Sequence, residues 1–220
     1  MSCKLSLVIF VISFASIFAA QSTALAQQSS LPQVSTTSSA TSVASKLVIA
    51  AKERLSHTVT YDGSYLRIDY PNGDVPSGIG VCTDVIIRAY RRLNIDLQQL
   101  VHEDMKVNFE QYPSKRIWGL SRPDTNIDHR RVPNLQAFFK RNGQSLPLST
   151  KKEDFLPGDI VTWMLPRNLP HIGIVVDEKS VLTGNLLIVH NIGRGPKLDD
   201  ILFSYEMTGH YRFDGLVVIE

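Results

Sequence analysis

The fold class is decided by residues 170–177, Pro-His-Ile-Gly-Ile-Val-Val-Asp. This stretch is short, apolar and rich in β-branched residues, as expected for a buried β-strand, and it carries the ionisable His171 at its start. Three further stretches of strand-like composition lie at 159–165, 186–192 and 211–219, all after Gly158. We therefore predict an antiparallel β-sheet in the C-terminal part of the chain.

Before Gly158 the apolar residues recur with the period of helices instead. Helices first and an antiparallel sheet afterwards predict an α+β domain. We expect extended chain at 58–70, a turn at 71–74, and an ordered loop at 109–132, which is rich in Pro, Arg, Asp and His. The expected helices cover 46–55 and 83–93, begin after the capping residue Asp96, and run from Pro133 to Gly143.

The N-terminal residues have the pattern of an export signal. Lys4 supplies a positive charge, an apolar run follows from Leu5 to Ala20, and the small residues of 24–26 fit a cleavage site. A retained membrane anchor is the alternative, although the apolar run is marginal in length for a membrane span. Residues 27–45 contain ten Ser or Thr among nineteen and predict a disordered tether. We expect residues 1–26 to be a signal peptide, residues 46–220 to form one domain, and the product to be periplasmic without a stable membrane span.

The composition excludes several classes of protein. The 220 residues include 23 Lys and Arg against 21 Asp and Glu, a net charge of +2, so no strong field recruits nucleic acid. The two cysteines, Cys3 and Cys82, are too few for a disulfide scaffold or a four-cysteine zinc site. We expect a monomer without a metal or other cofactor. Signal cleavage would leave Cys82 alone, either as a small buried apolar residue or as a nucleophile.

Cys82 stands at the predicted start of the 83–93 helix. The positive end of the helix dipole and the unpaired N–H groups there favour a thiolate. Glycines at 73, 78 and 80 would let the backbone approach a substrate closely. The alternative is structural, because Cys82 is in phase with Ile86 and Ala89 and could simply extend the apolar face.

A nucleophilic cysteine needs a base, and the base needs a group that fixes its tautomer. His171 begins one predicted strand and His190 lies near the end of the next. If those strands pair, both rings can lie at one edge of the sheet. The helix that starts at Cys82 would then have to pack at that edge.

These residues carry a resemblance to a known family. Residues 156–161 (Leu-Pro-Gly-Asp-Ile-Val), 171–174 (His-Ile-Gly-Ile) and 189–190 (Val-His) resemble the NlpC-type cell-wall peptidases of the papain-like clan. The resemblance implies a papain-like fold with Cys82 as the nucleophile, His171 as the base and His190 as the residue that orients it. Residues 80–84, 126–133 and 209–212 resemble more closely a bacterial family of domains of unknown function, family 1287.

The chain departs from the peptidases near the nucleophile, where Asp-Cys-Ser-Gly is replaced by Val-Cys-Thr-Asp at 81–84. The clan's tyrosine that assists the oxyanion site is matched by Tyr61, Tyr65 or Tyr70. The loop at 128–131 has no counterpart in the simple peptidases, and it would either bind a substrate carboxylate or form a structural ion-paired loop. His57, His102 and His210 are expected to be surface or structural. The candidate oxyanion and substrate-binding residues are therefore Tyr61, Asp84, Asp128, His129, Arg130 and Arg131.

The resemblance and the predicted export favour a thiol hydrolase, an amidase or endopeptidase, that acts on the peptides of peptidoglycan or on other peptides. The first alternative is a non-catalytic periplasmic domain that binds wall peptides or acts as a scaffold on the same fold. The second alternative is a metal site with Cys82, His171 and His190 as ligands, which no His-Glu-x-x-His helix supports.

Overall fold

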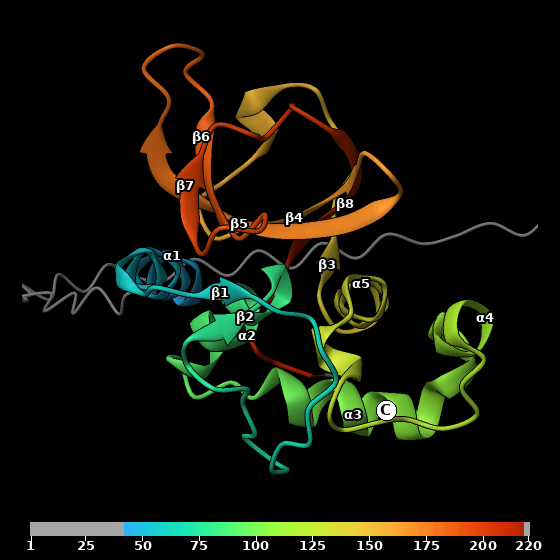
Figure 1. Cartoon of the computed structure of the whole chain (residues 1–220). Coiled ribbons are helices and arrows are strands. Elements are labelled where there is room, and N and C mark those ends of the chain that lie inside the picture. Colours follow the sequence, from blue (N-terminus) through green and yellow to red (C-terminus); the bar gives the residue numbers. More distant parts are fainter. Residues whose placement is uncertain (1–41, 218–220) are drawn as a thin grey trace, which may run out of the picture. The chain divides into compact units, whose positions relative to one another are not determined.

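The computed structural model describes residues 42–217, and helices precede the sheet along this range (Figure 1). The predicted signal peptide and most of the predicted tether lie outside the described residues. In this range the helices are α1 (Val43–Glu53), α2 (Cys82–Arg91), α3 (Leu97–Asn108), α4 (Ser114–Trp118) and α5 (Val132–Asn142), with 3₁₀ turns η1 (Arg54–Ser56), η2 (Phe109–Gln111), η3 (Asp128–Arg130) and η4 (Lys152–Asp154).

Helix α1 begins earlier than the predicted domain boundary at Lys46. The side chain of Ser42 caps it by accepting a hydrogen bond from the N–H of Ser45 at 3.2 Å. Residues 43–45 are therefore helical and do not belong to a tether. Helices α2, α3 and α5 follow the sequence pattern, with Asp96 capping α3 and Pro133 in the first turn of α5. Helix α4 and the turns η2 and η3 lie in residues 109–132, which were predicted to be a loop without helix.

A six-stranded antiparallel sheet forms the second half of the described chain, in the order β3-β8-β4-β5-β6-β7. This arrangement confirms the α+β class. The register places His171 opposite Trp163 and Gly173 opposite His190. The strands are β3 (Gln144–Ser145), β4 (Ile160–Leu165), β5 (Leu169–Lys179), β6 (Leu186–His190), β7 (Lys197–Asp199) and β8 (Glu206–Arg212).

One strand prediction was wrong in position. The last strand was predicted at 211–219, but β8 covers Glu206–Arg212, and the Glu, Thr and Gly residues in its first half interrupt the apolar pattern from which a strand is recognised. The expected extended stretch at 58–70 contains β1 (Thr60–Tyr61), which pairs in parallel with β2 (Ile79–Gly80).

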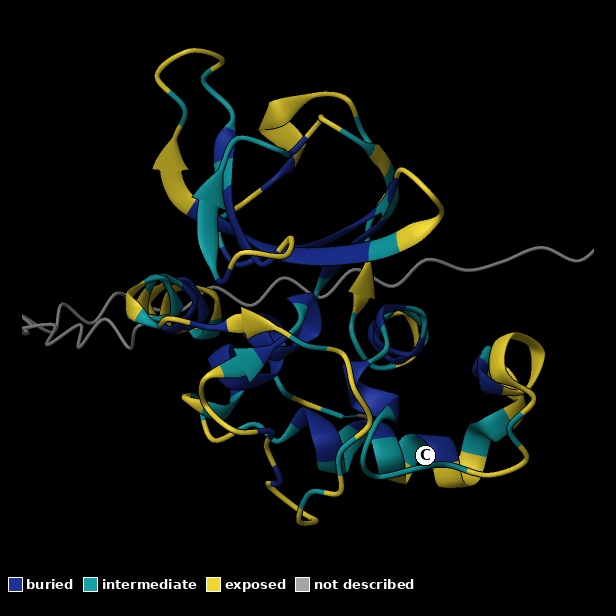
Figure 2. Ribbon diagram, in the orientation of Figure 1, coloured by how far each residue is buried: buried dark blue, intermediate teal, exposed yellow. Residues whose placement is uncertain are grey.

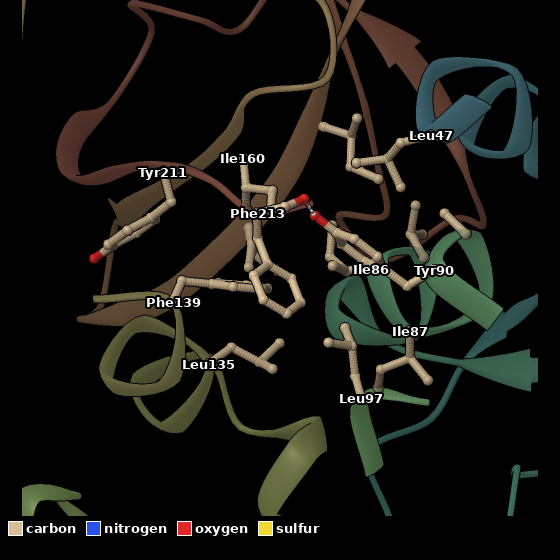
Figure 3. Close-up of a cluster of buried hydrophobic side chains, with 14 of the residues drawn as sticks. Leu47, Ile86, Ile87, Tyr90, Leu97, Leu135, Phe139, Ile160, Tyr211 and Phe213 are labelled. Carbon is tan, nitrogen blue, oxygen red and sulfur yellow. Dashed lines mark hydrogen bonds between the residues drawn. The ribbon is translucent and has the colours of Figure 1, made fainter. Parts of the chain in front are cut away.

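The helices pack on one face of the sheet and enclose the main core (Figures 2 and 3). In Figure 3 the hydroxyl of Tyr90 on α2 donates to the carbonyl of Phe213 at 2.9 Å, so the buried phenol is satisfied where helix and sheet meet. A smaller cluster that includes Phe155 and Trp163 covers the other face. The central strands β4, β5 and β6 are consequently buried on both faces. Every helix in residues 42–217 is too short or too polar to cross a bilayer.

Candidate active site

Cys82 is the first residue of α2, and local hydrogen bonds fix that helix start. Val81 is extended, and its N–H donates to the carboxylate of Asp84 at 2.7 Å, which satisfies a donor at the helix N-terminus. The hydroxyl of Thr83 donates to the carbonyl of Arg130 at 3.0 Å. The residues on both sides of Cys82 are therefore anchored, and its side chain has a defined direction.

The thiol of Cys82 lies against the start of β5. The backbone N–H groups of Ile172 and Thr83 and the hydroxyl of Tyr61 act to lower the pKa of the thiol, which places all three near the sulfur. Just after β6, Asn191 donates to the carbonyl of Gly80 at 3.5 Å. Helix α2, which begins with Cys82, thus packs against β5, the strand that carries His171.

Two imidazole rings and a carboxylate form a line behind this position. Nε2 of His171 lies 3.0 Å from Nδ1 of His190, and Nε2 of His190 lies 3.1 Å from Oδ2 of Asp199. Both histidines are buried, whereas the side chain of Asp199 is 41% exposed. The ring of Trp163 stands 6.0 Å from that of His171 and restricts its position.

The sequence did not indicate Asp199. It lies in β7, which is three residues long and has no apolar alternation. Its place beside His190 follows from the antiparallel pairing of β6 with β7, a contact that no local pattern reveals. Its position nine residues after His190 does not by itself indicate that the two side chains meet.

Burial governs the protonation of the site. Burial raises the pKa of Cys82 to about 11, although the N–H groups of Ile172 and Thr83 act in the opposite direction. Burial also lowers the pKa of His171 to about 3, and the neighbouring His190 lowers it further. The resting site therefore holds a neutral thiol and a neutral imidazole. The expected thiolate at the helix start is not supported, because desolvation outweighs the N–H groups.

A cleft of about 880 Å³ opens beside Cys82. The aromatic residues along it include Tyr61 and Trp118, and Arg131 contributes a guanidinium that stacks 4.1 Å from the centre of the Trp118 ring. A second cavity, of about 490 Å³, shares Arg116 and two further lining residues with the first.

The structure distinguishes the three candidate tyrosines. Only Tyr61 among them contacts the thiol, and burial of its hydroxyl end raises its pKa, so that it stays protonated and can donate. Tyr65 also borders the cleft, but its hydroxyl donates to Asp124 at 3.1 Å. Tyr70 packs edge-on against the ring of His102 at 5.0 Å.

Most of the charged candidates lie behind the cleft wall. The side chains of Asp84 and Arg130 are 3% and 2% exposed and form a bidentate ion pair with both N···O distances at 3.0 Å. Asp128 is buried and accepts from the N–H of Asp124 at 2.6 Å, and His129 is buried as well. Asp84, Asp128 and His129 do not line the cleft. Arg130 and Arg131 both line it, and Arg131 is paired with Asp128 at 3.3 Å.

The remaining histidines lie elsewhere. His210 is a buried structural residue that bonds Asp159 at 2.6 Å and stacks on Phe155 at 4.4 Å. His57 faces the carbonyl of Glu53 on the surface. Over residues 42–217, no group of three or more His, Cys, Asp or Glu side chains has an arrangement that could hold a metal ion.

The comparisons with known proteins give one close family match. The model of the family described as "Domain of unknown function (DUF1287)" matches residues 48–213. The Uncharacterized protein YijF of Escherichia coli (strain K12) is 50% identical over 163 residues, which are 74% of this chain and 78% of YijF.

Two solved structures are more distant. NlpC1 from Trichomonas vaginalis has a TM-score of 0.41 at 17% identity, with 77% of this chain and 43% of that structure covered. NlpC2 from the same organism has a TM-score of 0.40 at 16% identity, with 79% and 47% covered. The chain thus spans less than half the length of either structure.

Proposed function

This chain belongs to the family Domain of unknown function (DUF1287), and from that premise we propose that it is an exported cysteine hydrolase that cleaves peptide or amide bonds in cell-wall peptides. One observation carries the proposal. The only free thiol in the described residues lies at a helix start and at the edge of a cleft, near the backbone N–H of Ile172, and the adjacent His171 is hydrogen-bonded to a second histidine. Nucleophile, base and orienting group occur in the order that covalent catalysis needs.

The atoms of the site suit an acyl-transfer reaction. The Cys82 sulfur attacks the carbonyl carbon, and its proton passes to Nδ1 of His171, since Nε2 of that ring is bonded to His190. The hydroxyl of Tyr61 and the N–H groups at the start of α2 are the donors available to the oxyanion. The C–N bond then breaks and the amine leaves with the proton held by His171. Water, deprotonated by the same ring, cleaves the thioester and restores the thiol.

The protonation of the resting site bears on the order of proton transfer and sulfur–carbon bond formation in the first step. The thiol and imidazole are both neutral, so the proton leaves sulfur as the sulfur–carbon bond forms. Negative charge then develops on the substrate oxygen rather than on a buried sulfur. This timing makes the reaction depend on the correct tautomer of His171.

The shape of the cleft supports a peptide substrate. The cleft beside Cys82, of about 880 Å³, leaves room for several residues of a peptide. The wall location rests on the predicted export signal and on the sequence motifs shared with NlpC-type peptidases. The exposed aromatic rings beside the thiol offer apolar contact area for the substrate backbone and side chains.

A non-catalytic wall-peptide-binding domain is the second candidate. The observation that favours it is the burial of the thiol, of which only 4% is exposed, together with its raised pKa. On this interpretation Cys82 is a packing residue and the cleft binds peptides without cutting them.

Digestion of purified sacculi tests the proposal. The full-length protein is expected to release soluble muropeptides, detected by liquid chromatography and mass spectrometry, and Cys82→Ala is expected to release none above background. His57→Ala, which changes a surface histidine away from the cleft, is the control and should cut as the wild type does. Circular-dichroism melting of each variant shows whether it is folded.

Two results would count against the hydrolase. Undiminished cutting by folded Cys82→Ala would exclude this thiol as the nucleophile. Binding of the wild-type protein to sacculi without any release would favour the binding domain.

A further inference from the structure

Three adjacent strands of the sheet contribute one continuous hydrogen-bonded line of side chains. His171 comes from β5, His190 from β6 and Asp199 from β7, with N···N and N···O separations of 3.0 and 3.1 Å. The planes of the two rings stand at 87° to each other. The line begins at a carboxylate whose side chain is 41% exposed and ends at the ring of His171, the residue before Ile172, whose backbone N–H acts on the Cys82 thiol.

The direction of these hydrogen bonds follows from the carboxylate. An ionised carboxylate only accepts hydrogen bonds, so Nε2 of His190 must carry the hydrogen that faces Asp199. A neutral imidazole has one N–H group, which leaves Nδ1 of His190 as an acceptor. Nε2 of His171 must then be the donor between the rings, and Nδ1 of His171 keeps a free lone pair.

Both rings are neutral in the folded protein, so each carries one N–H group and one acceptor nitrogen. Burial lowers the pKa of His171 and of His190, and Lys197 on β7 also lowers that of His190, whereas Asp199 acts in the opposite direction. These are the charged groups that act on the two histidines from the strands packed against them.

Without the carboxylate, the hydrogen bond between the two rings could have either ring as its donor. The pair alone is equally satisfied if Nδ1 of His190 donates to Nε2 of His171. In that arrangement Nδ1 of His171 carries a hydrogen and cannot take the proton of the thiol. The two arrangements differ only in where two hydrogens lie, and no steric contact distinguishes them.

We infer that Asp199 is a positioning residue: through His190 it holds His171 in the tautomer that leaves Nδ1 free to act as a base. The inference rests on the proposed function for its catalytic meaning, but the tautomer itself is a property of the folded protein. Asp199 touches neither the thiol nor the cleft. Its effect reaches His171 only through His190, which is hydrogen-bonded to both of them.

The substitution that tests the inference is Asp199→Asn. It keeps the size of the side chain, but the amide can donate to Nε2 of His190 and so favours the reversed line. We expect the hydrolytic rate to fall about 100-fold or more, as for other catalytic histidines whose orienting carboxylate is changed to an amide. Asp199→Glu, which restores an acceptor, is expected to recover part of the rate.

A spectroscopic readout separates positioning from folding. Long-range ¹H–¹⁵N correlation spectra of the ¹⁵N-labelled full-length protein, with His171 assigned by means of His171→Gln, distinguish the two tautomers of the ring. The wild type is expected to carry its hydrogen on Nε2 of His171, and Asp199→Asn is expected to move it to Nδ1. Asp200→Asn is the matched control, because Asp200 bonds Thr183 and Asn185 instead of His190 and should change neither readout.

The outcomes separate this inference from the proposed function. A wild-type His171 with its hydrogen on Nδ1, or a folded Asp199→Asn whose tautomer and rate both match the wild type, would overturn the role of Asp199. The expected tautomers in a protein that cuts no peptide would support the inference and leave only the hydrolase proposal in error.

Discussion

Loss of the Asp84 carboxylate is predicted to destabilise the whole domain, and the structure gives the size of the effect. Asp84 pairs with Arg130 through two N···O contacts of 3.0 Å, and neither side chain is more than 3% exposed. Asp84 also accepts the N–H of Val81 at 2.7 Å at the start of α2. Asp84→Ala therefore removes a helix-capping bond and leaves a guanidinium buried without its counter-ion.

The two losses can be given magnitudes. Breaking a buried ion pair by removing one partner costs about 3 to 5 kcal/mol, because the remaining charge stays desolvated. Loss of the bond at the helix start adds about 1 kcal/mol. For a domain of this size each kcal/mol lowers the melting temperature by about 2 to 4 °C, so we expect a decrease of about 8 to 24 °C.

Thermal and urea unfolding followed by circular dichroism measure this change. The matched control is Glu110→Ala, which breaks the Lys115–Glu110 pair, whose side chains are 64% and 72% exposed. Such an exposed pair contributes less than about 1 kcal/mol, and the control should melt within about 4 °C of the wild type. Replacing both partners, Asp84→Ala with Arg130→Met, should recover part of the loss, because no buried charge remains.

The reasoning is refuted if Asp84→Ala melts like Glu110→Ala. A weakened interaction with substrate at unchanged stability would instead assign Asp84 to substrate binding, as the sequence alone allowed.

Three further predictions concern acid stability, thiol reactivity and packing. Burial lowers the pKa of His129 from 6.5 to about 3. Below pH 6.5 this histidine is therefore protonated in the unfolded chain but not in the folded protein, and the free energy of unfolding falls as the pH drops. His129→Asn should remove about 3 kcal/mol of that decrease between about pH 6.5 and 4 in urea titrations, and an unchanged slope would contradict the assignment. The alkylation rate of Cys82 by iodoacetamide should keep rising towards pH 11, and a plateau below about pH 8 would show an activated thiolate instead. A Cβ at Gly173 would lie 2.5 Å from a side chain of β6, so Gly173→Ala should lower the free energy of unfolding by about 1 to 3 kcal/mol. Gly78→Ala is the control and should lower it little, because no atom lies within 4 Å of the added Cβ. Equal stabilities of the two variants would show that the strands move apart without cost.

The parts of the fold that the sequence predicted are those with strong local patterns. The apolar stretches of β5 and β6 place His171 and His190 at their ends, and pairing of the strands brings the rings together. The start of α2 at Cys82 follows from the glycine-rich approach and the apolar stripe after it. Local pattern and tertiary structure agree at these positions because apolar burial determines both.

The parts that the sequence missed depend on polar contacts between distant residues. Asp84 and Arg130 are 46 positions apart, and nothing near either residue shows that both are buried. Asp199 lies in a strand too short for a period to be recognised. The state of the thiol could not be predicted for a similar reason, because the helix start is visible in the sequence whereas the desolvation of Cys82 is not.

The central claim is that the Cys82 sulfur forms a covalent bond with the acyl part of a peptide substrate. Acid quenching of the wild-type protein during turnover of a purified muropeptide, followed by intact-mass and peptide-mapping mass spectrometry, tests it most directly. We predict an added mass equal to the acyl fragment on the peptide that contains Cys82, and no such mass in Cys82→Ala. Turnover without any adduct, at a rate that Cys82→Ala retains, would contradict the account.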